Sequence, residues 1–496
     1  AYSASQNCAR LSGQASRTRA SAVVAFDRVA EASAVASWVA SCGGSVDAVA
    51  PTEGPCGLGL LATGPVKRND ILISMPASLA LSAESALRSS MGVYLTEFEP
   101  DLADYAFIAL ALLHERRLGE QSELATWLRQ DTLLPAGGFD NLPLISDPEG
   151  IAELDGATMA GAAKRRDSIL ADYAWLQENV FEAAPVVFPE SVFSIEAFTA
   201  AVALSISRSV VVADSDGNPT PMLLPVFELL NHNGRLPSAI VQERSSKAGG
   251  IFNRGDAASC VALVATCDLE EGSEICIRYG GDTAGELLLD HGFIEEPVDA
   301  AVAISVAIDE DDTFLDEKLD VLENAGVDLE PSWMLREEEE PPSELLAFMR
   351  LKRLDAADAF LLEPVFFDVL WSEHLQLPVS PENEAAALGE AAAICNAGLE
   401  KLGASVQEDL QVLAEAPKTD SAYRLAAVRY AERRALQAAS RWFEAKMSDL
   451  KNVEYYQERR LSALGLNPVE SEEELDALRS ESSRAAGRRF EQNVDW

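Results

Sequence analysis

The stretch Gly272-Ser273-Glu274-Ile275-Cys276-Ile277-Arg278-Tyr279-Gly280, together with the earlier Glu228-Leu229-Leu230-Asn231-His232, decides the fold of this chain. The later stretch has the composition of a β-strand and ends on a tyrosine followed by glycine. The earlier stretch closes an apolar run with Asn231-His232, which alone is typical of a turn capped by the asparagine side chain. Their occurrence together, in this order, indicates two segments of one compact domain.

The overall composition excludes several classes of protein. At 496 residues the chain is too long for one ordinary hydrophobic core, so we expect two or three domains. It contains 39 basic and 81 acidic residues, a net charge of -42. Such a surface repels nucleic-acid phosphates and attracts basic partners. No run approaches the roughly 18 continuous apolar residues that a membrane span requires. We therefore predict no nucleic-acid binding and no membrane span.

The cysteines predict neither a metal site nor a disulfide framework. There are seven of them, scattered along the chain, and none forms a Cys-x-x-Cys pair. Only four histidines accompany them, so a structural zinc site is not expected. An odd, scattered set of thiols is typical of a reducing compartment.

The N-terminal segment differs from the rest of the chain. The first 26 residues contain Arg10, Arg17 and Arg19, many Ser and Ala, and no Asp or Glu. This contrast with the acidic remainder is typical of an organelle transit peptide. A plain disordered tail has the same features, so for residues 1–30 both interpretations stay open.

Hydrophobic periodicity predicts alternating β-rich and helical regions. We expect a short helix at 31–42, mainly helical structure from 82 to 196, and helix almost to the end after residue 312. Strands are expected at 58–63, 71–76, 239–241, 260–265, 274–279 and 298–308. The acidic runs Asp309–Asp312 and Glu337–Glu340 are expected to be solvated loops.

Two further motifs are weak when taken singly. Cys56-Gly57-Leu58-Gly59 has a glycine pair that lets backbone approach a ligand. It fails as a dinucleotide fingerprint because the next glycine is too far along and no strand precedes it, which makes an oxidoreductase remote. Arg208, at the end of a helix beginning near Ile195, is the kind of cation that complements a helix C-terminus.

Taken in order, Gly57-x-Gly59, Arg208, Asn231-His232, Tyr279-Gly280 and Glu286–Phe293 resemble a SET domain, the fold of many protein-lysine methyltransferases. The chain is similar in particular to the Rubisco large-subunit methyltransferase family, from about residue 34 to 460. The segment Arg424–Leu436 also resembles a helix of that family's second domain. The resemblance implies an α+β fold, in which a SET-domain β-fold with a helical insertion is followed by an all-α substrate-binding domain. The implied boundaries are 1–30 for the tail, 31–81 for the SET N-terminal part, 82–196 for the insert, 197–297 for the SET C-terminal part and 298–496 for the helical domain.

The same resemblance implies S-adenosylmethionine as cofactor and assigns roles to individual residues. Tyr279 matches the family's active-site tyrosine. Glu228, where the family usually has Asp, and His291 would contact the substrate. The cofactor-binding residues would be Cys56, Gly57, Leu58, Gly59, Arg208, Asn231 and His232.

The chain departs from the family's pattern on the acceptor side. Ala284 stands where the family commonly has Asn, and His291 stands where it has a second pocket tyrosine. Val212 aligns loosely with a substrate-contacting Arg. We therefore expect the cofactor side to be retained and the acceptor pocket to be reshaped.

Methyl transfer to an amine is an in-line displacement that depends on alignment and needs no metal. A free lysine has a pKa near 10.4, and an apolar channel next to a positive sulfonium would lower it. Tyr279 would orient the amine by hydrogen bonding. The resemblance implies transfer to a lysine, less readily to a histidine, of a protein with a basic surface or within a large assembly. The alternative is a non-catalytic SET-domain scaffold subunit of a multiprotein complex in a plastid. The expected location is the chloroplast stroma, with the cytoplasm as the alternative.

Overall fold

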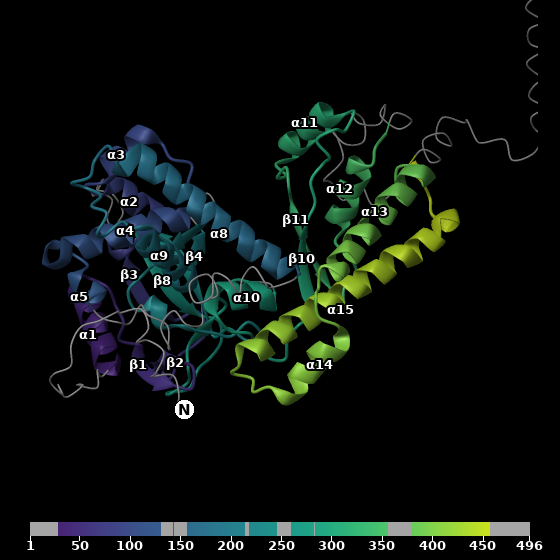
Figure 1. Cartoon of the computed structure of the whole chain (residues 1–496). Coiled ribbons are helices and arrows are strands. Elements are labelled where there is room, and N and C mark those ends of the chain that lie inside the picture. The colour runs from purple at the N-terminus through teal and green to yellow at the C-terminus, as the bar shows by residue number, and fades with distance from the viewer. Residues whose placement is uncertain are drawn as a thin grey trace, which may run out of the picture. The chain divides into compact units, whose positions relative to one another are not determined.

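The computed structural model describes residues 28–129, 142, 156–213, 218–245, 259–281, 283–355 and 378–456. The chain divides into two compact units, Ala1–Asp299 with Gly403–Ala431, and Ala300–Leu402 with Glu432–Trp496. Figure 1 labels many of their helices and strands. The tail or transit peptide expected at 1–30 lies almost wholly outside the described residues. The domain boundaries drawn from the resemblance stay predictions.

A β-hairpin follows the first helix of the first unit. Helix α1 (Arg28–Ser41) precedes β1 (Val49–Gly54), which pairs antiparallel with β2 (Gly57–Ala62). Gly54 lies opposite Gly57, so only two residues form the turn between the strands. A strand over 58–63 was predicted and is confirmed by β2, whereas β1 was not predicted.

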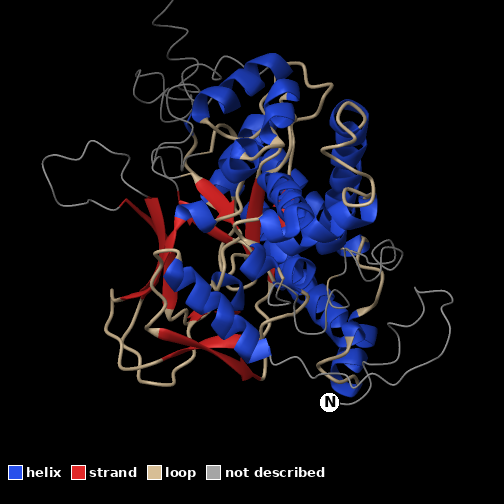
Figure 2. Cartoon of the chain, turned by 90° about the vertical axis from the view of Figure 1, so that its left-hand side faces the viewer, coloured by secondary structure: helices blue, strands red, loops and turns tan. Residues whose placement is uncertain are grey.

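A three-stranded antiparallel sheet lies next along the chain, in the order β3-β8-β7 (red in Figure 2). Its members are β3 (Ile71–Pro76), β8 (Ser259–Ala265) and β7 (Ala239–Ser245). The central strand β8 is buried throughout its middle, which explains its continuous apolar sequence. All three strands fall where the sequence predicted them.

A short parallel pair connects the two stretches that opened the sequence analysis. In it, β6 (Asn231–His232) pairs with β9 (Cys276–Ile277). The predicted strand over 274–279 was too long, because the chain leaves the ladder after Ile277. A 3-10 turn, η5 (Phe227–Leu229), precedes β6.

Helices cover the remaining length of the first unit, and α4 packs on α9 in its core. Ile108 and Leu112 of α4 and Phe198 of α9 are fully buried, as the helical spacing of apolar residues predicted. The Ser194 side chain accepts a hydrogen bond from the Ala197 N–H and so fixes the start of α9. The described helices and the remaining strands of this unit are α2 (Ala83–Arg88), α3 (Gly92–Phe98), α4 (Asp104–Leu118), α5 (Ala125–Leu128), α8 (Ala157–Leu176), α9 (Ile195–Arg208), β4 (Val210–Ala213), β5 (Pro219–Met222), α10 (Ala284–His291) and α14 (Val406–Glu415).

The second unit is mainly helical but also contains a two-stranded antiparallel ribbon. Strand β10 (Ala301–Ser305) falls in the predicted run 298–308. Its partner β11 (Ser332–Arg336) was missed, because the sequence analysis expected helix there. The described helices are α11 (Leu315–Ala325), α12 (Ser343–Lys352), α13 (Pro381–Glu400) and α15 (Ser421–Ser448), the last of which begins in the first unit.

The acidic turn after β10 differs from the solvated loop that was expected. The Lys318 side chain is fully buried, and its Nζ lies 2.6 Å from Oδ2 of Asp312. Asp312 is itself largely buried, whereas Asp309 is half-exposed and pairs with Lys352 at 2.6 Å. The turn therefore neutralises two buried lysines, which a count of charges along the sequence does not reveal. Among the described residues, no helix is both long and apolar enough to cross a membrane.

Candidate active site

Distant segments meet at Asn231. Its side-chain Nδ2 donates a hydrogen bond to the backbone O of Leu58 on β2, 3.2 Å away, and another to Oε1 of Glu274 at 2.8 Å. The pairing of β6 with β9 sets this position, because Asn231 lies opposite Cys276. One amide side chain therefore holds together the hairpin, β6 and the segment before β9.

The hairpin contains two glycines, and a side chain is disfavoured at each of them for a different reason. Gly57 has a φ of +93°, a backbone conformation that residues with a side chain rarely adopt. Gly59 lies against Asn231, and a Cβ there would be 2.8 Å from its Nδ2 and 3.0 Å from Oε1 of Glu274. Cys56, in the turn, is exposed. Residues 56–59, predicted as cofactor-binding, thus form one glycine-rich turn and strand beside Asn231.

Tyr279 lies near the end of the stretch Gly272–Gly280. It makes hydrogen bonds through both its hydroxyl and its backbone N–H. Its hydroxyl donates to the backbone O of Leu230 at 2.5 Å, and its backbone N–H donates to Nδ1 of His232 at 3.2 Å. Burial raises the pKa of Tyr279 to about 12. The phenol is therefore neutral at pH 7, and its oxygen retains lone pairs that can accept a hydrogen bond.

His232 is a buried, neutral imidazole that orders the chain around it. Because Nδ1 accepts the Tyr279 N–H, the ring hydrogen belongs on Nε2, which lies 3.5 Å from Oε2 of Glu295. Glu295 also accepts the backbone N–H of Gly234 through Oε1 at 3.0 Å. Burial lowers the pKa of His232 below its ordinary value, although Glu295 opposes the shift.

Arg208 and Glu228 lie together in the core beneath β6. Nη1 of Arg208 donates to the backbone O of Glu228 at 3.1 Å. The Glu228 carboxylate is directed elsewhere, since its Oε1 accepts a 2.8 Å hydrogen bond from Nε1 of the buried Trp127. Glu228 is only 3% exposed. The substrate contact predicted for its side chain stays a prediction, and the contact that the structure describes is with Trp127.

His291 packs against Tyr279, with ring centroids 4.5 Å apart. Its Nδ1 lies 3.1 Å from the backbone O of Ser207, and only a protonated Nδ1 can form that hydrogen bond. Nε2 therefore carries a lone pair. Burial, in the first place, lowers the pKa of His291 to about 4, so the ring is neutral at pH 7.

Two other positions where the chain departs from the family's pattern have structural roles. Ala284 is the first residue of α10, where the Thr283 hydroxyl accepts from the backbone N–H of Glu286 and forms a capping box. Val212 on β4 is 1% exposed and belongs to the hydrophobic core. An arginine at Val212 would have no room to reach a substrate without repacking that strand.

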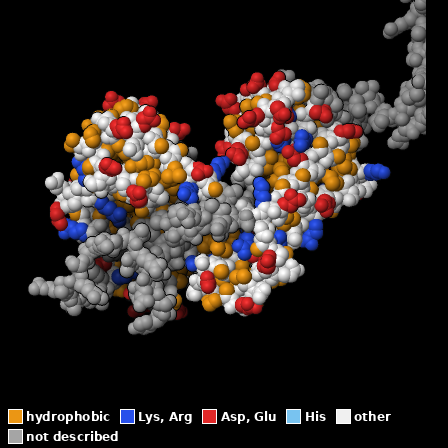
Figure 3. Space-filling view, in the orientation of Figure 1, with side chains coloured by type: hydrophobic (Ala, Val, Ile, Leu, Met, Phe, Trp, Pro, Cys, Tyr) orange, Lys and Arg blue, Asp and Glu red, His pale blue; other side chains and the backbone are white. Residues whose placement is uncertain are grey.

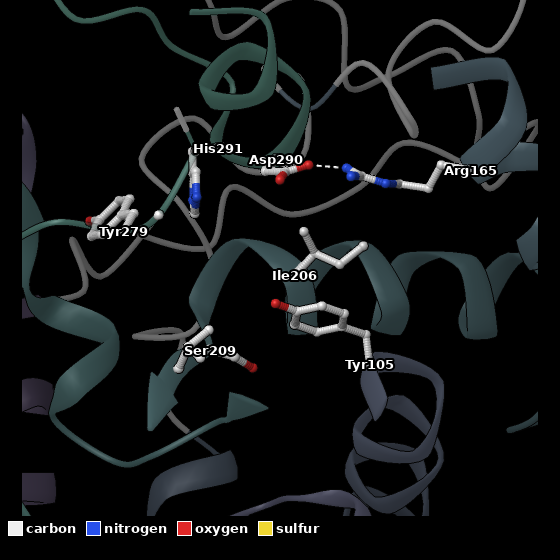
Figure 4. A pocket seen from close by; sticks show the side chains of 10 residues that line it. Tyr105, Arg165, Ile206, Ser209, Tyr279, Asp290 and His291 are labelled. Atoms are coloured by element: carbon white, nitrogen blue, oxygen red, sulfur yellow. Dashed lines mark hydrogen bonds and ion pairs between the residues drawn. The ribbon is translucent and has the colours of Figure 1, made fainter. Parts of the chain in front are cut away.

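A pocket of about 310 Å³ opens beside Tyr279 (Figure 4). It brings together residues from helices α4, α8, α9 and α10 and from β4. The lining residues are Tyr105, Arg165, Ile206, Ser209, Val211, Tyr279, Gly280, Gly281, Asp290 and His291.

Sequence reasoning gave no role to several lining residues, Tyr105, Arg165 and Asp290 among them. Tyr105 and Arg165 lie in the region 82–196, which was predicted only to be mainly helical. Asp290 lies within the quoted motif Glu286–Phe293 but received no role. In the structure, Arg165 and Asp290 form an ion pair along the pocket wall. The one local signal for this pocket was Asp290 itself, an acidic residue next to His291, which differs from the tyrosine that the family has at that position. In the part of the chain that the structure describes, no group of His, Cys, Asp and Glu side chains is arranged to hold a metal ion.

Comparisons with known proteins agree with this geometry. Residues 309–436 match the family described as Rubisco LSMT substrate-binding. The chain is 28% identical over 414 residues to the chloroplastic ribulose-1,5-bisphosphate carboxylase/oxygenase large subunit N-methyltransferase of Pisum sativum, covering 83% of this chain and 81% of that protein. It is 27% identical over 424 residues to the chloroplastic fructose-bisphosphate aldolase lysine N-methyltransferase of Arabidopsis thaliana, covering 84% and 83%.

A solved structure is also similar over most of its length. The crystal structure of the SET domain of LSMT bound to lysine and AdoHcy matches with a TM-score of 0.72 at 25% identity, covering 91% of this chain and 98% of that chain. Fold, site and relatives together define a SET-domain protein methyltransferase. Within that class, the chain is similar to the Rubisco large-subunit methyltransferases, as its motifs indicated.

The cofactor-side residues fit S-adenosylmethionine. Gly57 and Gly59 have no side chains of their own, which allows close approach of another group to the hairpin backbone. Among the described residues, the buried Nε of Arg208 has no hydrogen-bond partner. A guanidinium matches the carboxylate that S-adenosylmethionine carries. The Asn231 amide offers polar atoms beside the same hairpin.

Proposed function

We propose that this chain transfers a methyl group from S-adenosylmethionine to a lysine side chain of a protein substrate, with Tyr279 at the reacting centre. The observation that carries the proposal is the meeting of the Gly57–Gly59 hairpin, Asn231 and Tyr279 around β6 and β9. A pocket beside Tyr279 gives an acceptor side chain a way in.

The cofactor side would be formed by residues 56–59 together with Arg208, Asn231 and His232. When bound, S-adenosylmethionine supplies an electrophilic methyl group on a sulfonium. Asn231 keeps the hairpin in place through its bond to the Leu58 carbonyl, which leaves the hairpin backbone preorganised for binding. His232 acts one step away, since its Nδ1 holds the backbone N–H of Tyr279.

Tyr279 would orient the acceptor nitrogen. Its hydroxyl hydrogen is used on the Leu230 carbonyl, so its oxygen can only accept a hydrogen bond from an amine N–H. That contact directs the nitrogen lone pair toward the donor carbon, which is a positioning effect. With a pKa of about 12, the phenol is not ionised near neutral pH and does not act as the base.

The amine must lose one proton in the overall reaction, because a neutral amine attacks and a methylammonium forms. The pocket is only partly polar, and burial there disfavours the ammonium form of an entering lysine. His291 packs against the Tyr279 ring in the pocket lining and places a neutral imidazole where the family has a second tyrosine. Glu228 would support the site from beneath, through its backbone contact with Arg208 and its carboxylate contact with Trp127.

The surface charge supports a substrate with a basic face or a large assembly. The net charge is -42, and acidic side chains are spread over the visible face of each unit (Figure 3). Such a surface attracts basic proteins over a distance of about 8–10 Å at physiological salt. The relatives from Pisum sativum and Arabidopsis thaliana are both named as chloroplastic. Their names support a plastid location, and we propose the stroma within it.

Transfer of a labelled methyl group tests the proposal. The pure protein is incubated with radiolabelled S-adenosylmethionine and a plastid lysate, and the labelled band is digested for mass spectrometry. We expect one labelled protein that carries methyl-lysine, and no band with Tyr279→Phe. A labelled methyl group on histidine would contradict the proposal that lysine is the acceptor. Cofactor binding without any labelled band would favour the scaffold alternative, and absence of cofactor binding at millimolar concentration would contradict both the cofactor and the enzyme.

A further inference from the structure

The pocket beside Tyr279 contains an ion pair that the proposed mechanism does not use. Arg165 on α8 and Asp290 on α10 both line the pocket and pair through Nη1 and Oδ1. Figure 4 shows Asp290 and His291 as neighbours, with the ion pair drawn as a dashed line. The Arg165 side chain is 34% exposed and that of Asp290 is 21% exposed.

A purely structural role explains little of this arrangement. A pair with this exposure contributes about 1 kcal/mol or less to stability. It joins α8 to the helix that ends in His291, and both residues line the pocket. Burial raises the pKa of Asp290, and the Arg165 guanidinium opposes that shift by favouring the charged carboxylate.

We propose that the Arg165–Asp290 pair sets the protonation state of the acceptor amine in the pocket and thereby the pH at which methyl transfer begins. This inference rests on the function proposed above. An amine entering the pocket meets both charges. The Asp290 carboxylate stabilises its ammonium form, and the Arg165 guanidinium destabilises it. In the pair the two effects oppose each other, so a change in either residue unbalances them.

The other titratable groups around the pair do not change the opposing effects of Asp290 and Arg165 on the amine. Tyr105 on α4 responds to both members of the pair and is neutral because burial raises its pKa. His291 is neutral. Glu286, one turn earlier on α10, acts on Asp290 with the same sign as other acids. Arg208, beneath Tyr279, adds a positive charge that no change in the pair removes.

The two neutralising substitutions are expected to have opposite effects. Asp290→Asn leaves Arg165 alone, favours the neutral amine and moves the pH midpoint of the transfer rate down. Arg165→Gln leaves the Asp290 carboxylate without the neighbouring guanidinium, favours the ammonium form of the amine and moves the midpoint up. Each shift is about half to one pH unit for a charge several ångströms from the nitrogen. The double variant returns close to the wild type.

The experiment measures initial rates of label transfer to the lysate band between pH 6.5 and 10, for wild type, both single variants and the double variant. Arg165→Lys keeps the charge and should keep the wild-type midpoint. Melting temperatures and S-adenosylhomocysteine affinity, measured by calorimetry, separate folding from the pH effect. Opposite shifts support the inference. Shifts in the same direction, or none, overturn it while the wild-type band still supports the proposed function, whereas no band in the wild type removes the function itself.

A second readout needs no turnover. With S-adenosylhomocysteine present, calorimetry at pH 7 measures the affinity for n-butylamine, a cation that stands in for the lysine side chain. Asp290→Asn should weaken its binding several-fold and Arg165→Gln should strengthen it, because only the lone carboxylate attracts the cation. Equal affinities in wild type and both variants contradict the inference. If Asp290→Asn does not fold, the Arg165→Gln shift and its rescue by Arg165→Lys still decide the outcome.

Discussion

The two sides of the proposed site are built in different ways. The cofactor side consists mostly of backbone, in the Gly57–Gly59 hairpin and β6, and a single amide from Asn231 holds it together. The acceptor side consists of side chains from four helices and a strand that meet beside Tyr279. A backbone site requires glycines and one asparagine at fixed positions and so leaves a motif in the sequence. A side-chain pocket leaves no such motif, and it is on this side that the chain departs from the pattern of the family it resembles.

The largest effect is expected for Tyr279→Phe, which should impair methyl transfer but not cofactor binding. Tyr279→Phe removes the oxygen that orients the amine but keeps the ring against His291. Methyl transfer should fall by about 100-fold or more, because misplaced reactants lose most of the advantage of alignment. Affinity for S-adenosylmethionine should stay within about threefold, by calorimetry. A Phe variant that transfers methyl groups at the wild-type rate would remove Tyr279 from the reacting centre.

On the acceptor side, the buried His291 should make the free energy of unfolding depend on pH. The pKa of His291 is about 4 in the folded chain, against about 6.5 when unfolded. The unfolded chain therefore binds the extra proton first, and stability is lost as the pH falls from about 6.5 to about 4. The loss attributable to this group is up to about 3 kcal/mol. Urea unfolding of wild type and His291→Gln at pH 7 and pH 5 measures it.

The His291→Gln variant should lose less stability than the wild type between these two pH values. Buried His114 and His232, whose pKa values are also lowered by burial, titrate in both proteins and cancel in the difference. Parallel losses in the two proteins would mean that His291 is charged or exposed in the folded chain.

A smaller effect, on the free energy of unfolding, is expected for a substitution at the buried Glu228. Glu228→Asp restores the family's usual acid but shortens the side chain by one methylene. It withdraws the carboxylate from Nε1 of the buried Trp127 and leaves a donor without its partner. The free energy of unfolding should fall by about 2 kcal/mol. The control is Glu123→Asp, the same change at an exposed residue near that tryptophan, where no loss is expected in urea unfolding. Equal stabilities of the two variants would contradict a structural role for the longer acid.

The smallest effect tests the cofactor side alone. In Gly59→Ala the new methyl would lie 2.8 Å from Nδ2 of Asn231, so the amide must move away from the hairpin. We expect cofactor affinity to fall about tenfold, which corresponds to about 1.4 kcal/mol. Gly64→Ala is the matched control, because a methyl there meets no atom within 4 Å. If both alanine variants bind the cofactor equally well, the hairpin is not part of the cofactor site.

The sequence was a good guide where local pattern and backbone geometry coincide. The helix ending at Arg208, the strands β2, β3, β7 and β8, and the β6 motif were all predicted. The parallel pairing of β6 with β9 joins segments far apart in the chain, and the sequence analysis predicted only that the two stretches belong to one compact domain. The hydrogen bond from Asn231 to the Leu58 carbonyl was not predicted.

What the sequence could not predict depends on partners chosen in three dimensions. Strand β11 was assigned to helix because its pairing with β10 lies outside any local window. The burial of Lys318 against Asp312 contradicts the rule that acidic runs are solvated. Arg165 and Asp290 lie on different helices, and neither helix indicates the other. Long-range side-chain contacts of this kind leave no periodicity to detect.

The most direct test of the central claim is calorimetric titration of S-adenosylmethionine into wild type and Asn231→Ala, with the exposed Asn324→Ala in the second unit as control. If Asn231 joins the hairpin to β6 to form the cofactor site, its alanine variant should bind about tenfold to 100-fold more weakly. The control should bind like the wild type. Wild-type affinity in Asn231→Ala would contradict the account.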